Sequence, residues 1–500
     1  MNTHASFSPV SLSYVAALRG VKPRLPGQSF NYMVVDCQKP EWLVALAASN
    51  PEGQFYGLSA QSSLCAKGED IARERMAGNV KFLCATARQA VDRIEQNPSY
   101  LPQMNYLCCN ETSGNESVSV IDRSALFDLA TRLVLPNGMF ATTYKTNESE
   151  EGLLRFLVRE LAPEMNAQQA QELLTEFKKL GGTYLSKHID HAMKLASATL
   201  RNIPDEFFAL FDQGEACSST FDTMVAMGAR GFTYAGDCHI SSNYLELSLP
   251  PEAQPVVLSC ISNPLYEPLK DFAMNRLVRS DIWCRQPAVT SANPAELFSA
   301  FSFGIPAPRE AIPTNVLAPG KTIRLDTPLY AKLIDLMALL PISVGDFLAH
   351  PTSAGHTVEE TLEAIQILVA CGIAVPMRGQ TAQTKLSALD QPRMCGNHNR
   401  YLDQEAINNP SLYFASTVWG DAYEVSARDA LVMQALDRAG LVNSISALLP
   451  ELQRIANNPK LAAQIMDVAM PTEETARQMI ESSLQGDIIK WYAYGILEAA

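Results

Sequence analysis

The chain has 500 residues, 47% of them hydrophobic, and its 39 basic and 53 acidic side chains leave a net charge of −14. This composition excludes a disordered or collagen-like chain and provides ordinary cores for two to four domains. The acidic balance disfavours binding to nucleic acid or anionic lipid. The longest apolar runs are shorter than the roughly 20 residues of a membrane-spanning helix.

The N-terminus and the cysteines indicate a cytoplasmic protein. Residues 1–6 have neither a basic start nor an apolar core, so we expect no secretory signal. The eleven cysteines form no Cys-x-x-Cys pair, which favours reduced, mostly buried thiols. His188 and His191 would share a helical face, but no third ligand is near, so we expect no metal site.

The first 147 residues alternate strand-like and helical patterns with short links. The strand-like segments are 31–36, 54–59, 79–85, 104–109 and 139–144, and the helical ones are 40–49, 69–77, 87–96 and 124–133. Such alternation is typical of a parallel sheet with helices on both faces. We therefore predict an α/β fold in which residues 1–147 form a Rossmann-like, doubly wound domain.

The remaining chain divides into four predicted parts. Residues 148–210 form a helical segment, and 211–325 a mixed middle domain and linker with a strand at 231–235 and a basic helix at 271–285. In residues 326–380, three helical patterns (328–340, 344–350 and 358–371) and a strand at 372–377 suggest a winged-helix-like module, whose acidic third helix suits protein packing better than DNA. Residues 381–500 form a mainly helical C-terminal domain.

Several segments together resemble a known family. Residues 45–57 and 79–85 look like its first helix and its second and third strands, and Leu135-Pro136-Asn137-Gly138 looks like its Leu-x-Pro-Gly-Gly turn. Residues 271–279 are similar to its Asp-Phe-x-x-Asn-Arg-x-Phe-Arg stretch, and 413–420 to a C-terminal segment. The chain thus resembles class I S-adenosylmethionine methyltransferases with a methyltransferase regulatory domain, to which bacterial protein-lysine methyltransferases acting on outer-membrane proteins are also similar.

The positions that this resemblance assigns to the cofactor differ from the family pattern. The family has glycines that let the backbone approach the cofactor, and this chain has other residues there. It also lacks the carboxylate that binds the ribose hydroxyls, the Asp that contacts the adenine amino group, and the His-Gly pair that follows the fourth strand. The residues now at these places are Asp36, Gln38, Pro40 and Glu41 for the glycines, Ser59, Thr86, and Asn110-Glu111. We therefore expect a degenerate pocket with no bound cofactor and no catalytic residue.

The resemblance leaves three functions open. The leading hypothesis is a catalytically silent homologue that serves as a scaffold or regulatory subunit, with an active relative or a second copy of itself as partner. The first alternative is an active S-adenosylmethionine-dependent methyltransferase on protein side chains with a rebuilt pocket. The second is a binder of another small ligand. Asp237-Cys238-His239 offers a nucleophile and a base, but neighbouring residues of a strand point to opposite faces.

Two groups of residues are candidate partner contacts. Arg276, Arg279 and Arg285 would make a positive strip, and Trp491 and Tyr492 would supply aromatic anchors near the C-terminus, both residue types common in binding hot spots. The alternative is that the arginines pair with carboxylates of their own chain and that Trp491 packs the last helix onto the core.

Overall fold

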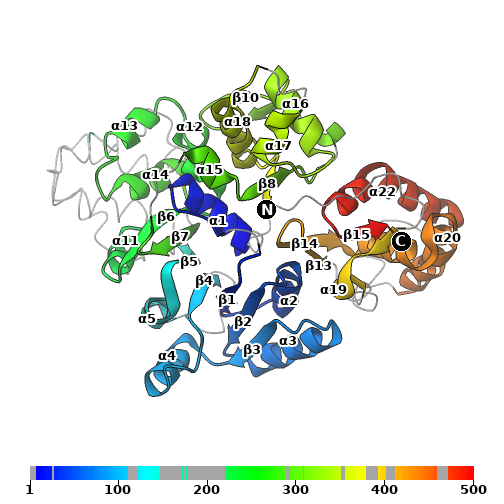
Figure 1. Cartoon of the computed structure of the whole chain (residues 1–500), viewed down its shortest axis with the longest axis horizontal. Helices are drawn as coiled ribbons and strands as arrows, with labels where there is room; N and C mark the ends of the chain where they lie inside the picture. Colours follow the sequence, from blue (N-terminus) through cyan, green and yellow to red (C-terminus); the bar gives the residue numbers. More distant parts are fainter. Residues whose placement is uncertain are drawn as a thin grey trace, which may run out of the picture.

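A seven-stranded sheet lies at the centre of the structure, a computed structural model (Figure 1). Its strand order is β3-β2-β1-β4-β5-β7-β6. The structure describes residues 7–24, 27–110, 122–146, 172, 176, 220–276, 278–288, 293–307, 309–350, 355–378, 392–400, 411–458 and 471–499. The predicted segment 148–210, apart from residues 172 and 176, and the His188 and His191 pair lie outside these ranges.

Strands β1 to β5 are parallel and follow the predicted pattern. They are β1 (Phe30–Val35), β2 (Gly53–Ser59), β3 (Val80–Cys84), β4 (Met104–Asn110) and β5 (Val134–Lys145). Because successive side chains of a strand point to opposite faces, Tyr32 and Met33 enter different cores. The first core includes α1 (Pro9–Leu18), α2 (Pro40–Ser49) and α3 (Ser62–Glu74), and the second α4 (Ala87–Gln96), α5 (Arg123–Leu133) and α11 (Thr220–Gly228). The predicted α/β class is confirmed.

The sheet continues beyond residue 147 with two strands from the middle of the chain. β6 (Phe232–Asp237) and β5 both pair antiparallel with β7 (Val278–Arg285), which lies between them. The predicted basic helix over 271–285 is therefore wrong in its second half. Helix α14 (Tyr266–Met274) ends at Asn275, whose φ of 53° is left-handed, and the chain then turns into β7.

The next part of the chain contains the three helices predicted there. They are α16 (Pro328–Met337), α17 (Val344–Ala349) and α18 (Val358–Ala370). The winged-helix arrangement itself is not confirmed, because β11 (Val375–Arg378) pairs antiparallel with β8 (Phe301–Gly304) from the predicted linker. That linker also contains α15 (Pro294–Phe298) and the hairpin of β9 (Asn315–Leu317) and β10 (Thr322–Arg324).

The C-terminal part contains strands as well as the predicted helices. Its elements are β12 (Pro392–Met394), α19 (Gly396–Arg400), β13 (Ser411–Ser416), β14 (Asp421–Ser426), α20 (Ala427–Ala456), α22 (Glu473–Ala493) and β15 (Leu497–Ala499). The β13–β14 hairpin lies against α2 (Figure 1), where the Ser49 hydroxyl donates to the Asp421 carbonyl at 2.8 Å. None of the helices in the described ranges is long and apolar enough to cross a bilayer.

Candidate functional site

The residues that occupy the expected cofactor positions lie along one edge of the sheet. Asp36 follows β1, Ser59 ends β2, Thr86 comes shortly after β3, and Asn110 ends β4. Since these strands are parallel, their carboxyl ends meet at the same edge, which is where doubly wound sheets bind ligands. The structure therefore brings together the positions that the sequence singled out.

The loop between β1 and α2 is held by its own side chains. Asp36 has a left-handed φ of 57°, and residues 37–39 have no positive φ. The Gln38 amide donates to the Asp36 carboxylate at 2.7 Å, and Pro40 is buried in the first turn of α2. Burial raises the pKa of Asp36, with the bond from Gln38 acting against it. The loop thus has ordinary side chains in a tight turn rather than an open glycine backbone.

Two basic side chains tie this edge to neighbouring elements. The Lys39 ammonium donates to the Tyr413 hydroxyl of β13 at 3.3 Å and lies 5.9 Å from the centre of its ring. Glu41, in the first turn of α2, forms an ion pair with Lys67 of α3 at 3.3 Å. The loop after β1 therefore contacts the C-terminal hairpin directly, a contact that no sequence signal indicates.

Ser59 and Thr86 stabilise local backbone. Ser59 is buried, its hydroxyl accepts from the Gln61 backbone N–H at 3.2 Å, and its carbonyl accepts from the Cys65 thiol at 3.7 Å. Thr86 caps α4, where its hydroxyl accepts from the Gln89 N–H at 3.2 Å while the Gln89 side chain accepts from the Thr86 N–H at 2.9 Å. Neither position presents a carboxylate to this edge.

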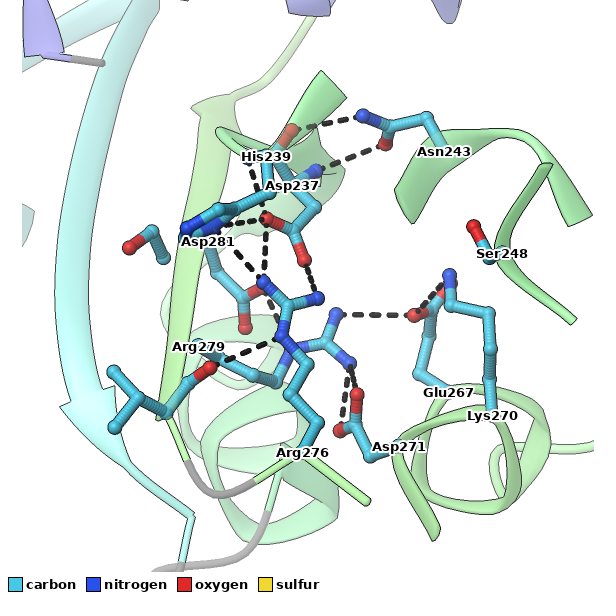
Figure 2. A network of polar contacts seen from close by, with 12 residues as sticks. Asp237, His239, Asn243, Ser248, Glu267, Lys270, Asp271, Arg276, Arg279 and Asp281 are labelled. Atoms are coloured by element: carbon cyan, nitrogen blue, oxygen red, sulfur yellow. Dashed lines mark hydrogen bonds and ion pairs between the residues drawn. The ribbon is translucent and has the colours of Figure 1, made fainter. Parts of the chain in front are cut away.

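A second polar site, which we call the buried ion cluster, lies where β5 and β6 end and β7 begins, at the same edge of the sheet. Figure 2 shows its side chains. It consists of Asp237, Glu267, Lys270, Asp271, Arg276, Arg279 and Asp281. Arg279 is completely buried, and its guanidinium reaches three carboxylates at 2.7 to 3.0 Å, those of Asp271, Asp281 and Glu267. It also donates to the Tyr234 hydroxyl at 2.7 Å. The guanidinium is thus the centre of the cluster.

Arg276 is the second arginine of the cluster and contacts Asp237 and His239. It pairs with Asp237 at the end of β6 and lies 3.0 Å from the His239 ring nitrogen. Burial alone would raise the pKa of Asp237, but Arg276, the hydrogen bond from His239 and the charge of Arg279 together outweigh this effect and lower it. Burial raises the pKa of Asp281 to about 6, because Arg279 offsets the desolvation only in part. The two carboxyl groups therefore titrate in different pH ranges.

These contacts correct the predicted partner surface. Arg276 and Arg279 are enclosed in ion pairs with their own chain, and the Arg285 guanidinium donates to the Thr131 and Val134 carbonyls. Trp491 and Tyr492 are 1% and 2% exposed and belong to the C-terminal core. Arg279 and the two aromatic side chains are buried, and Arg276 and Arg285 are only partly exposed. Each arginine meets a carboxylate or carbonyl of its own chain, and the rings pack in the C-terminal core.

The other chemical candidates yield no reactive set. Cys238 is buried, and burial raises the pKa of its thiol well above the usual value, while the His239 ring contacts Arg276 and Asp237. No group of three or more His, Cys, Asp or Glu side chains in the described part of the chain has the arrangement of a metal site.

Comparison with known proteins identifies the architecture. Residues 209–285 match the family described as a predicted methyltransferase regulatory domain, and no curated protein matches the chain. Two solved structures are similar over nearly the whole length, both with a TM-score of 0.61 and covering 99% of this chain and 98% of theirs. They are PKMT2 from Rickettsia typhi in complex with AdoHcy, 16% identical, and PKMT2 from the same organism, 15% identical. The chain therefore has a class I S-adenosylmethionine methyltransferase fold, and its residues 209–285 match a predicted methyltransferase regulatory domain.

Proposed function

We propose that this chain is a catalytically silent methyltransferase homologue that acts as a scaffold or regulatory subunit of a protein complex. The observation that supports this function is the loop after β1. Gln38 and Pro40 occupy positions where a close approach of the cofactor needs glycine. The Gln38 side chain donates a hydrogen bond to Asp36, and Pro40 is the first residue of α2. A ligand bound there as in active relatives would have to displace these contacts.

The losses at the neighbouring strands add to this effect. Ser59 is 2% exposed and its hydroxyl is used by the Gln61 backbone, so it offers no bidentate acceptor to ribose hydroxyls. Thr86 is used as a helix cap. Each missing hydrogen bond costs about 1–3 kcal/mol, and three of them would weaken cofactor binding by several orders of magnitude. We therefore propose that the protein works without a cofactor.

The partner in this proposal is a protein. It is an active methyltransferase relative or a second copy of this chain. The complex would form in the cytoplasm, and the partner would bind to surfaces outside the sheet. The net charge of −14 argues against nucleic acid as the partner. Because Arg279 and Trp491 are buried and the Arg276 side chain is only 10% exposed, the contact surface has to be sought on other residues.

Cofactor titration tests the proposal most directly. Isothermal titration calorimetry of the full chain with S-adenosylmethionine and with S-adenosylhomocysteine is expected to show no saturable heat, with Rickettsia typhi PKMT2 as the positive control. Affinity purification from the host, followed by size-exclusion chromatography, is expected to yield a stoichiometric complex or a homodimer. Micromolar cofactor affinity, or only a monomer without copurifying protein, would remove the support for this function.

An active methyltransferase on protein side chains is the second candidate. It is favoured by the match over 99% of the chain to a structure that contains AdoHcy. In this case the rebuilt loop would hold the cofactor through side chains instead of glycine backbone. Incubation of the purified chain with host proteins and S-adenosylmethionine carrying a labelled methyl group distinguishes the candidates. Only an active methyltransferase would transfer the label to protein.

A further inference from the structure

A cavity of about 570 Å³ opens between α1, α15, α18 and η2 (Ile240–Asn243). It contains none of the residues of the loop after β1, so it is separate from the degenerate cofactor edge. Small-molecule pockets in proteins measure about 300–1,000 Å³, which places this cavity in the usual range. Its lining residues belong to α1 and the turn after it, to η2 and the adjoining Tyr244, to α15 and to α18. The helices α1, α15 and α18 lie close together in Figure 1.

The floor of the cavity is aromatic and packed from behind. Phe298 is only 2% exposed, and its ring meets that of Tyr14 edge-on, with 5.5 Å between centroids. Tyr14 is itself fully buried and also contacts Phe301 at 5.7 Å. Tyr244 and Leu362 extend this apolar wall. The buried rings of Phe298, Tyr14 and Phe301 support the lining from behind, so a ligand would not have to order it.

One polar wall is equally fixed. The Asn243 side-chain oxygen accepts from the Asp237 backbone N–H at 2.9 Å, and its amide donates to the Asp237 carbonyl at 2.8 Å (Figure 2). Asp237 belongs to the buried ion cluster. Asn243 is therefore held between the cavity and that cluster, and its amide is used by the protein backbone rather than left for a ligand.

The charges of the lining are not balanced. Glu359 and Glu363 are four residues apart on α18, so they share one face of the helix and repel each other. Both are exposed, and among the described residues the ion pair recorded on this helix is that of Glu360 with His356. Arg19 is the one cationic side chain in the lining. With two carboxylates and one guanidinium, the lining has a net charge of −1 next to its aromatic residues.

We propose that this cavity binds an organic cation with an apolar body. An ammonium group would lie between Glu359 and Glu363 and relieve their repulsion. The apolar body would lie against Tyr244 and Pro294, which line the cavity and are partly or fully exposed, and an aromatic ring such as that of Tyr244 attracts cations as well as hydrocarbon. Such a ligand would join α18 to the regulatory domain without reaching the cofactor edge.

Calorimetric titration of the full chain with 2-phenylethylamine tests the proposal, with 3-phenylpropionate as the anion of similar shape. A probe with roughly nine non-hydrogen atoms is expected to bind with a Kd of about 1 mM. Glu363→Gln and Glu359→Gln should each weaken it at least about fivefold, as expected for loss of one close charge. Glu296→Gln on α15 removes an exposed charge outside the lining and should leave the Kd unchanged.

A second variant tests the location independently of charge. Gln366→Trp places an indole in the cavity from the half-buried face of α18 and is expected to abolish binding of 2-phenylethylamine. Thermal unfolding confirms that each variant is folded. The proposal is overturned if no saturable binding occurs up to about 10 mM, if 3-phenylpropionate binds as well as the amine, or if the folded Gln366→Trp variant still binds the amine.

Discussion

Replacing Arg279 with methionine is expected to destabilise the β6–β7 side of the sheet. The arginine is fully buried and is bonded to Asp271, Asp281 and Glu267, which are themselves 0 to 5% exposed. Methionine fills a similar volume but leaves these carboxylates without their shared cation. Removing one partner of a buried ion pair costs about 3–5 kcal/mol. Because each 1.4 kcal/mol is a factor of ten, local opening should become roughly a hundredfold to several thousandfold more frequent.

Hydrogen exchange followed by mass spectrometry measures this effect locally, on peptides that cover β7. A local measurement is needed because a chain with several domains does not unfold in one step. Arg309→Met is the matched control, since the Arg309–Asp335 pair is exposed on both sides and such pairs contribute less than about 1 kcal/mol. Arg279→Lys keeps the charge but not the planar fork, so an intermediate increase is expected.

The reasoning is refuted if exchange in β7 of the Arg279→Met variant stays within about tenfold of the unmodified chain. It is also refuted if Arg309→Met accelerates exchange in β7 as much as Arg279→Met does. Either result would mean that the apolar packing of Ile282 and Trp283 holds this strand without help from the ion cluster.

Three further outcomes are expected. The folded-state pKa of Asp281, about 6, lies above the unfolded value of about 3.9, so this group stabilises the fold as the pH falls and the effect is lost as the pH rises through 6. Asp281→Asn should therefore lose about 1.4 kcal/mol of relative stability between pH 7.5 and pH 5, measured as exchange of β7 at both pH values; a pH-independent difference would contradict the assignment. Iodoacetamide should alkylate Cys84 before Cys37, because Cys84 is exposed while burial raises the pKa of the Cys37 thiol, and peptide mapping showing Cys37 first would contradict this order. Gly420→Ala should lower the melting temperature, because Gly420 has a φ of +76° and an added Cβ would come within 2.6 Å of the Arg378 side chain; an unchanged melting temperature would show that Arg378 moves aside without cost.

Local patterns predicted the parallel half of the sheet well. The helix at 40–49 was expected with the bounds that α2 has, because proline at its first position and an apolar run mark it clearly. Helix α1 was missed although it packs on the sheet. Almost every residue from Pro9 to Ala17 is buried, so the helix has no polar face and no period that a sequence pattern would reveal.

The errors elsewhere come from contacts between distant residues. In the sequence, Arg279 and Asp281 look like solvent-facing residues of a basic helix. In the structure they form a buried ion pair with each other, so charged residues stand in a buried strand and β7 lacks the apolar pattern that would mark it. The candidate site shows the same division. The strand ends identified Asp36, Ser59 and Thr86, whereas the contact of Lys39 with Tyr413 joins residues 374 positions apart and leaves no trace in either local sequence.

The position of β7 has a consequence for synthesis on the ribosome. β5 ends at Lys145, but the strand that covers its free edge begins only at Val278. While the intervening residues are being translated, the nascent chain exposes the unpaired backbone groups of β5, the kind of edge that pairs with other chains. Late, non-local pairing of this type slows folding and favours aggregation. Truncation after β5 should leave an insoluble fragment, and productive folding in the cell should depend on a chaperone that shields β5 until residue 285 has emerged.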